Sequence, residues 1–208
     1  MWEKPNPLKQ YIFRGIAKIG VFMTTELKQT PNKFNVIAVI DTKRIRATYP
    51  KPSQDKTKPT RINSNDLFLI VSGSTRVIET SEEIFKLELI AKPGDQLSFK
   101  STSIYANSQD ATIIYGIFQK NSTFKSFQPN FVTINRAFYN SENPDGLPPK
   151  YESITSVSYE AKVSRAGTEN LSVYIALYKL AKDGNTQELF GYFSWDFTIE
   201  ISRNTNQS

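Results

Sequence analysis

The fold is decided by residues 91–118, which read AKPGDQLSFKSTSIYANSQDATIIYGIF. Lys92–Asp95 is a tight turn, because proline fixes φ, glycine accepts a positive φ and aspartate bonds its own backbone. Apolar side chains alternate with polar ones from Leu97 towards Tyr105, which is the two-residue period of a strand with one buried face. After the polar residues Asn107–Asp110, the alternation returns at Ile113–Ile117. The stretch therefore predicts a turn, a strand, a short loop and a further strand.

Similar strand patterns recur along the rest of the chain. They cover Phe34–Thr42, Leu67–Val71, Thr75–Thr80, Phe85–Leu89, Phe131–Tyr139, Ile154–Val163, Leu171–Leu180 and Trp195–Ser202. The first of these is apolar nearly throughout, so we expect it to be covered on both faces. Ile154–Val163 and Leu171–Leu180 are expected to pair as a hairpin through Arg165–Gly167, and Lys182–Asn185 carries the Asp-Gly signal of another tight turn.

Few segments carry a helix pattern. Lys43–Ile62 holds three prolines among charged residues and is expected to be a long irregular loop. A short helix stays open as an alternative after Phe118 or near Asn135. Short strands separated by turn residues, of which Asn143–Pro149 is another example, predict an all-β fold. The expected form is an antiparallel β-sandwich with Greek-key or jelly-roll-like connections and few or no helices.

The chain divides by composition into a body and two flanking segments. Residues 34–202 are expected to form a single β-sandwich domain, residues 1–33 a basic N-terminal extension that is poorly ordered at least to residue 22, and residues 203–208 a polar tail. The apolar run Tyr11–Met23 is interrupted by Arg14 and Lys18 and has no small-residue cleavage site after it, so we do not expect a signal peptide. No apolar run is long enough to predict a membrane-spanning helix.

Four segments in order resemble one bacterial family. Ser101–Ile117 fits the pattern SxSIYANSxDAxIIYGI. Further matches are Val36–Thr42 with Tyr49–Pro50 and Pro52–Ser53 after it, Asn63–Ser64 leading into Leu67–Val71, and Tyr192–Asp196. In this respect the chain resembles the AidA/PixA-like inclusion body proteins. Thr60–Ile62 departs from the pattern, because it lacks the histidine expected beside Asn-Ser. The resemblance implies an all-β, cytoplasmic protein whose relatives are linked to quorum-sensing-regulated or stationary-phase expression, host association and accumulation as inclusions.

The composition excludes several kinds of active site. The chain has neither cysteine nor histidine, so it cannot form a disulfide, a zinc site of the usual ligands or a catalytic triad with an imidazole base. Catalysis would fall to carboxylates such as Asp41, Asp110 and Asp196, each at the end of an expected strand. No calcium-loop or phosphate-loop spacing is present. We therefore expect a protein that is not an enzyme and holds no metal or cofactor.

The net charge of +6 is unevenly distributed. Residues 1–61 carry a charge of +9 and the remainder −3. A patch for nucleic acid or anionic lipid is one interpretation, and an ordinary solvated surface is the other. Because aromatic residues are not interleaved with the basic ones as stacking on bases requires, nucleic acid is not the expected partner.

Two functions remain for the body of the protein. Tyr105, Asn107, Ser108 and Asp110 combine an aromatic ring with polar side chains in one loop, as a carbohydrate-binding site would; the alternative is that they only stabilise that loop. Leu171–Leu180 is apolar on both faces, which exceeds what one face of a sandwich buries. The leading hypothesis is a self-associating assembly protein, with a homodimer as the commonest arrangement.

Overall fold

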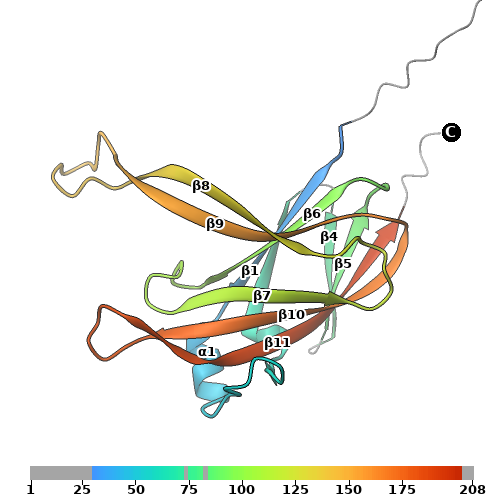
Figure 1. Cartoon of the computed structure of the whole chain (residues 1–208), viewed down its shortest axis with the longest axis horizontal. Coiled ribbons are helices and arrows are strands. Elements are labelled where there is room, and N and C mark those ends of the chain that lie inside the picture. The colour runs from blue at the N-terminus through green and yellow to red at the C-terminus, as the bar shows by residue number, and fades with distance from the viewer. Residues whose placement is uncertain (1–29, 73–74, 82–83, 203–208) are drawn as a thin grey trace, which may run out of the picture. The chain divides into compact units, whose positions relative to one another are not determined.

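The computed structural model describes residues 30–72, 75–81 and 84–202 (Figure 1). The expectations for the N-terminal segment up to residue 29 and for the tail at 203–208 lie outside these residues. No helix in the described part of the chain has the length and apolar character needed to cross a membrane.

The described residues confirm an all-β fold of two sheets. One sheet has the strand order β3-β1-β6-β9-β8 and the other β4-β5-β11-β10-β7, with β2 paired to β11. The strands are β1 (Lys33–Ile40), β2 (Thr60–Arg61), β3 (Leu67–Ser72), β4 (Thr75–Ser81), β5 (Ile84–Ile90), β6 (Gln96–Ser103), β7 (Ala111–Gln119), β8 (Gln128–Phe138), β9 (Lys150–Lys162), β10 (Gly167–Leu180) and β11 (Gln187–Ser202). The helical elements described are α1 (Thr42–Thr48) and the 3-10 helix η2 (Ser64–Asp66).

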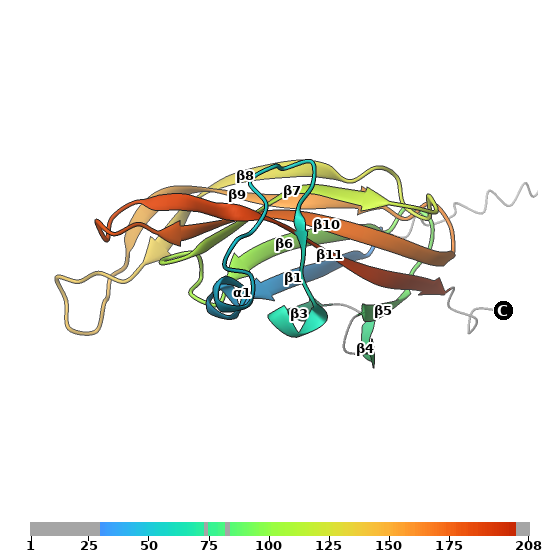
Figure 2. The ribbon, with the colours of Figure 1, turned by 90° about the horizontal axis from the view of Figure 1, so that it is seen from below.

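The core lies between the two sheets and takes side chains from both of them (Figure 2). On β11 the period-two pattern is regular: Phe193, Trp195, Phe197, Ile199 and Ile201 are buried, while the residues between them are partly exposed. Phe99 of β6 packs against Phe197 with ring centroids 5.2 Å apart, which joins the two sheets. Such aromatic pairs stabilise a core beyond the effect of buried area alone.

The sheets are mixed where the sequence predicted antiparallel ones. Most neighbouring strands are antiparallel, but β1–β6, β5–β11 and β2–β11 run parallel. Alternation along a strand reports which face is buried and carries no information about the direction of its neighbour. The parallel pairs join strands that are distant in sequence, and no turn signal marks such pairs.

The expected hairpin between residues 154–163 and 171–180 is wrong. β9 pairs with β6 and β8 in one sheet, whereas β10 pairs with β7 and β11 in the other. The backbone N–H groups of Ser164 and Arg165 bond to the carbonyl of Thr123, at 2.8 and 3.3 Å, and so lead the chain across the sandwich. By contrast, the predicted turn at Lys182–Asn185 does join the antiparallel strands β10 and β11.

Two further expectations near the N-terminus are corrected. β1 is buried on one face only, through Phe34, Val36, Ala38 and Ile40, while Ile37 is 36% exposed. Lys43–Ile62 is not irregular throughout, because α1 occupies its first part and β2 its end. The described residues after Phe118 and around Asn135, the two places where the sequence allows a short helix, contain none.

Candidate functional site

The loop that joins β6 to β7 holds the four residues predicted as a ligand site. Ala106 and Asn107 adopt positive φ values of 51° and 61°. The Asn107 Oδ1 accepts hydrogen bonds from the backbone N–H groups of Ser103, at 2.8 Å, and Thr112, at 3.1 Å. The Ser108 hydroxyl donates to the Tyr105 carbonyl at 2.7 Å. Asn107 and Ser108 therefore direct these polar groups to the loop itself.

Asp110 ends this loop and is buried, with 3% exposure. Both of its carboxylate oxygens accept hydrogen bonds from Nη1 of Arg46, at 3.1 Å each. The N–H of Leu180 on β10 also points to it, at 3.3 Å. Asp110 thus connects α1, the β6–β7 loop and β10, and Arg46 compensates its negative charge. The sequence did not indicate this cation, because it predicts an irregular loop where Arg46 lies on α1.

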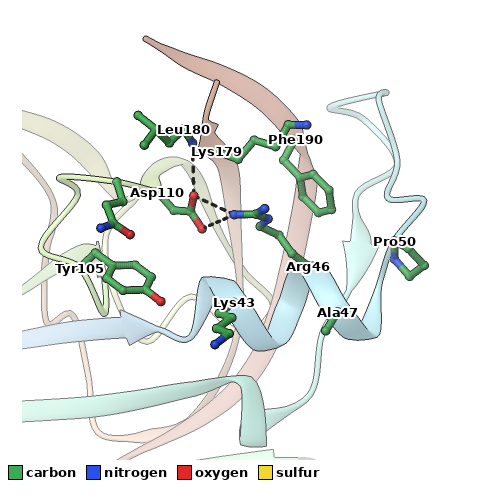
Figure 3. A pocket seen from close by; sticks show the side chains of 10 residues that line it. Lys43, Arg46, Ala47, Pro50, Tyr105, Asp110, Lys179, Leu180 and Phe190 are labelled. Carbon is green, nitrogen blue, oxygen red and sulfur yellow. Dashed lines mark hydrogen bonds and ion pairs between the residues drawn. The ribbon is translucent and has the colours of Figure 1, made fainter. Parts of the chain in front are cut away.

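A pocket of about 750 Å³ surrounds this ion pair (Figure 3). Its walls come from α1 and the residues after it, the β6–β7 loop, the end of β10 and the start of β11; they are Lys43, Arg46, Ala47, Pro50, Tyr105, Gln109, Asp110, Lys179, Leu180 and Phe190. Of the predicted residues, Tyr105 and Asp110 line this pocket and Asn107 and Ser108 do not. Figure 3 shows Tyr105 and Lys43 on one side of the ion pair and Phe190 on the other.

The pocket is electropositive. Three cations line it, Lys43, Arg46 and Lys179, against the single carboxylate of Asp110. Lys179 forms an ion pair with Glu188, at 3.0 Å, at the pocket margin. The arrangement offers cationic and amide donors beside the rings of Tyr105 and Phe190, which fits an anionic or sugar-like molecule better than an apolar one.

The three aspartates considered for catalysis occupy separate environments. Asp41 caps α1 by accepting a hydrogen bond from the N–H of Arg44 at 2.9 Å. Asp196 pairs with Arg61 at 3.0 Å and accepts a hydrogen bond from Ser172. It lines a different pocket from Asp110. In the described residues no group of three or more acidic side chains gathers to hold a metal ion.

The segment that follows α1 contacts β7 and β11, which belong to the sheet β4-β5-β11-β10-β7. Ser53 bridges to Tyr192, and the Tyr115 hydroxyl donates to the carbonyl of Lys56 at 2.8 Å. Burial, together with the neighbouring hydroxyls of Tyr174 and Tyr192, raises the pKa of Tyr115 to about 12. The Tyr115 hydroxyl therefore stays protonated at physiological pH and serves as a hydrogen-bond donor.

A second surface of note is the hairpin formed by β8 and β9. β8 pairs with β9 along its whole length, from Gln128 opposite Glu160 to Phe138 opposite Lys150. In both views the loop that joins the two strands is the outermost part of the described chain at that end (Figures 1 and 2). The apolar side chains that strands β8 and β9 leave exposed are Phe131 (65%), Val132 (48%), Ile134 (52%), Phe138 (37%), Tyr151 (67%) and Val157 (43%).

These exposed side chains occur on both faces of the hairpin. Phe131 lies opposite Val157 on the face that continues from the core, and Ile134 lies opposite Ile154 on the other. Between the first face and β7 runs a groove of about 690 Å³, with Phe131, Val157 and Tyr159 on one side and Ile113 and Ile114 on the other. Sequence reasoning located the strand at 131–139 but gave no sign that it leaves the body of the sandwich.

Comparison with known proteins identifies the family. A family model described as PixA, inclusion body protein, matches residues 32–201. The chain belongs to the PixA family of inclusion body proteins. This confirms the resemblance read from Ser101–Ile117 and its three companion segments. No curated protein matches the chain.

A solved PixA structure shares this fold. The inclusion body protein from Burkholderia cenocepacia J2315 is 30% identical, with a TM-score of 0.69, over 85% of this chain and 99% of that one. A cysteine protease inhibitor from Entamoeba histolytica is matched at 14% identity and a TM-score of 0.27, over 55% of this chain and 86% of its own. The seventh type I cohesin of ScaB from Pseudobacteroides cellulosolvens is matched at 10% identity and a TM-score of 0.19, over 85% and 97%.

Proposed function

We propose that this PixA-family protein is a non-catalytic protein that associates with copies of itself and accumulates as an ordered assembly. The observation that carries the proposal is the β8–β9 hairpin, whose exposed apolar side chains occupy both faces. Isolated exposed apolar residues are normal on a protein surface, but a contiguous group on a projecting element marks an interaction surface. A second copy is the simplest partner, since it carries the same surface.

Hydrogen bonds hold the β8–β9 hairpin and its end loop in a defined conformation. Its end loop is held by side-chain hydrogen bonds: the Asn143 amide donates to the Leu147 carbonyl at 2.7 Å, and the Tyr139 hydroxyl donates to the Pro144 carbonyl at 2.9 Å. Across the strands, Thr133 and Thr155 share a hydrogen bond of 2.8 Å. A pre-organised surface loses little conformational entropy on association, which favours binding.

The family description and the composition support the same function. The family is described as inclusion body proteins, a name that is in keeping with accumulation in condensed form, and a chain without cysteine needs no oxidising compartment to form disulfides. The proposal includes the cytoplasm as the place of accumulation and expression that follows population density or growth phase. Localisation of a fluorescent fusion during growth tests both parts: diffuse or extracellular signal in dense cultures contradicts them.

The direct test is the mass of the protein in solution. Size-exclusion chromatography with light scattering over a hundredfold range of protein concentration should give a mass that rises from one chain to two or more. Because the hairpin contacts are apolar, raising the salt concentration should not dissociate the assembly. A mass of one chain at every concentration contradicts the proposal.

The electropositive pocket supports a second candidate function, the binding of an acidic saccharide. The observation that favours it is that the rings of Tyr105 and Phe190 and the ammonium-bearing side chain of Lys43 line one hollow of about 750 Å³. Rings pack against the apolar face of a sugar, and a lysine attracts its carboxylate or sulfate. A glycan array tests this candidate. The site is supported if the protein binds acidic glycans and if Lys43→Ala and Tyr105→Ala each abolish the binding. Lys51→Ala, at an exposed lysine outside the pocket, is the control and should bind as the wild type does. Absence of binding above background removes this candidate.

A further inference from the structure

β8 is an edge strand without a partner on its outer side. It is eleven residues long, and among the described strands it pairs only with β9. In an antiparallel pair, alternate residues of an edge strand direct both their N–H and C=O groups away from the sheet. Roughly half of the β8 backbone is therefore available to pair with another strand.

β8 lacks the usual features that keep edge strands from pairing. Natural edges are protected by short length, by charges, by bulges or by proline. The β8–β9 pairing shows no shift of register, in contrast to β10–β11 and β7–β10. The single charge on β8, Arg136, is neutralised across the hairpin by Glu152 at 2.9 Å. Pro129, next to the first residue of the strand, leaves the remaining nine residues unobstructed.

On the basis of the proposed self-association, we propose that β8 is the interface between two copies of the chain. The two β8 strands pair antiparallel about a two-fold axis at Thr133, so that the sheets of the two copies join into one. A two-fold interface must be complementary to itself, with residue i of one copy facing residue j of the other and the reverse. The sequence of β8 meets this condition about Thr133.

With the axis at Thr133, apolar residues of the two copies meet on one face of the joined sheet. Val132 faces Ile134 of the second copy on one face, and Phe131 faces Asn135 on the other. Arg136 faces Asn130, so no like charges stand opposite each other. Cross-strand apolar pairs stabilise a sheet, whereas like charges directly opposite destabilise it. The chain carries +6 overall, so a contact between copies is favoured where the surface is locally neutral, as it is here.

Thr133 offers a test that depends on the register. Its side chain is exposed, and its hydroxyl bonds only to that of Thr155 among the contacts described. Lysine at this position places two ammonium groups against each other at the axis, and glutamate places two carboxylates there. Thr133→Lys and Thr133→Glu should each weaken self-association by about tenfold or more. An equimolar mixture of the two variants should restore a dimer that contains one copy of each.

The readout is sedimentation velocity of the full chain, with circular dichroism to show that each variant is folded. Ile70→Lys is the matched control, because Ile70 is 57% exposed on β3, the opposite edge of the same sheet. Its self-association should equal that of the wild type. If the wild type associates but Thr133→Lys associates equally well, or if Ile70→Lys alone dissociates it, the β8 interface is wrong while self-association stands. If the wild type is monomeric at all concentrations, the proposed function itself fails.

Discussion

Glu169 is a carboxylate inside the sandwich, with 0% exposure, at the start of β10. It accepts hydrogen bonds from the backbone N–H groups of Lys120, Asn121 and Thr123, at 2.8, 2.6 and 2.9 Å, and from the Thr123 hydroxyl. Burial alone would raise the pKa of Glu169, but these hydrogen bonds outweigh it and leave the pKa below its usual value. The Glu169 carboxylate therefore serves as the hydrogen-bond acceptor for backbone N–H groups in the turn after β7.

Glu169→Ala is expected to lower the free energy of unfolding by about 3 kcal/mol or more, because several buried N–H groups lose their acceptor together. Chemical denaturation at neutral pH measures this. Glu152→Ala is the control, since its ion pair with Arg136 lies at the surface and should contribute less than about 1 kcal/mol. Equal effects of the two substitutions would contradict the role assigned to Glu169.

Gly191 on β11 lies directly beneath the segment that crosses from α1. A Cβ at this position would lie 2.7 Å from Pro52 Cβ and 3.1 Å from the Ser53 carbonyl oxygen. Gly191→Ala should displace this segment, weaken the hydrogen bond from Tyr192 N to Ser53 O and cost about 1–3 kcal/mol of stability. The double variant Gly191→Ala with Pro52→Gly removes both the Cβ and the Cγ atom that obstruct the new methyl group, and should lose less stability than the two single variants together. Strict additivity in thermal denaturation would show that the contact with Pro52 is not the cause.

At the scale of elements, the sequence predicts strands well and their partners less well. Trp195–Ser202 alternates regularly and forms the end of β11, because burial between two sheets selects every second residue. The connection at 165–167 looks like a hairpin turn, yet its direction is set by backbone bonds to Thr123, which lies far away in sequence. No local pattern reports such a contact. The same limit applies to the parallel neighbours of β1 and β11.

Helix α1 was missed although its start signal is present. Asp41 is a strong N-cap residue and Pro50 follows the end of the helix, but the prolines beyond it dominated the interpretation of Lys43–Ile62. This omission also hid one wall of the candidate pocket, because Lys43, Arg46 and Ala47 all lie on α1. Tyr105 and Asp110 could be predicted from the loop, whereas the cations that face them could not.

The N-cap gives a prediction at this scale. Asp41→Ala removes the acceptor for the Arg44 N–H and should destabilise the protein by about 1 kcal/mol. Asp41→Asn keeps a side-chain oxygen for the cap and should stay close to the wild type. Urea denaturation of the three proteins compares them. A loss in Asp41→Asn as large as that in Asp41→Ala would mean that the charge, and not the cap, stabilises α1.

At the scale of the molecule, the two sheets differ in the strand pairings and side-chain hydrogen bonds that stabilise them. The sheet of β4, β5, β11, β10 and β7 is organised on β11, which is sixteen residues long and pairs with β10, β5 and β2. The other sheet has β9 and β6 at its centre, and there Glu160 joins Lys33 at 2.9 Å and Gln96 at 2.5 Å across three strands. Each sheet therefore contains a carboxylate whose ionised form is stabilised by several hydrogen bonds, Glu169 in one and Glu160 in the other.

This arrangement makes the stability of the whole fold sensitive to acid. Burial alone would raise the pKa of Glu160, but hydrogen bonds from Lys33, Asn130 and Ser158 leave the pKa below its usual value, as they do for Glu169 with its own donors. A carboxyl group whose pKa is lower in the folded than in the unfolded state stabilises the fold above the unfolded pKa. This stabilisation is lost as the pH falls from the unfolded pKa through the folded one.

We therefore expect the urea midpoint to be nearly constant from about pH 7 to about pH 5 and to fall steeply below the ordinary glutamate pKa of about 4.3. Glu169→Gln should start from a lower midpoint at neutral pH and fall less steeply, because one of the two titrating groups is absent. Glu152→Gln should keep the slope of the wild type. A wild-type midpoint that stays constant down to about pH 3 would contradict the assignment, since protonation of Glu160 and Glu169 must then cost the folded state nothing.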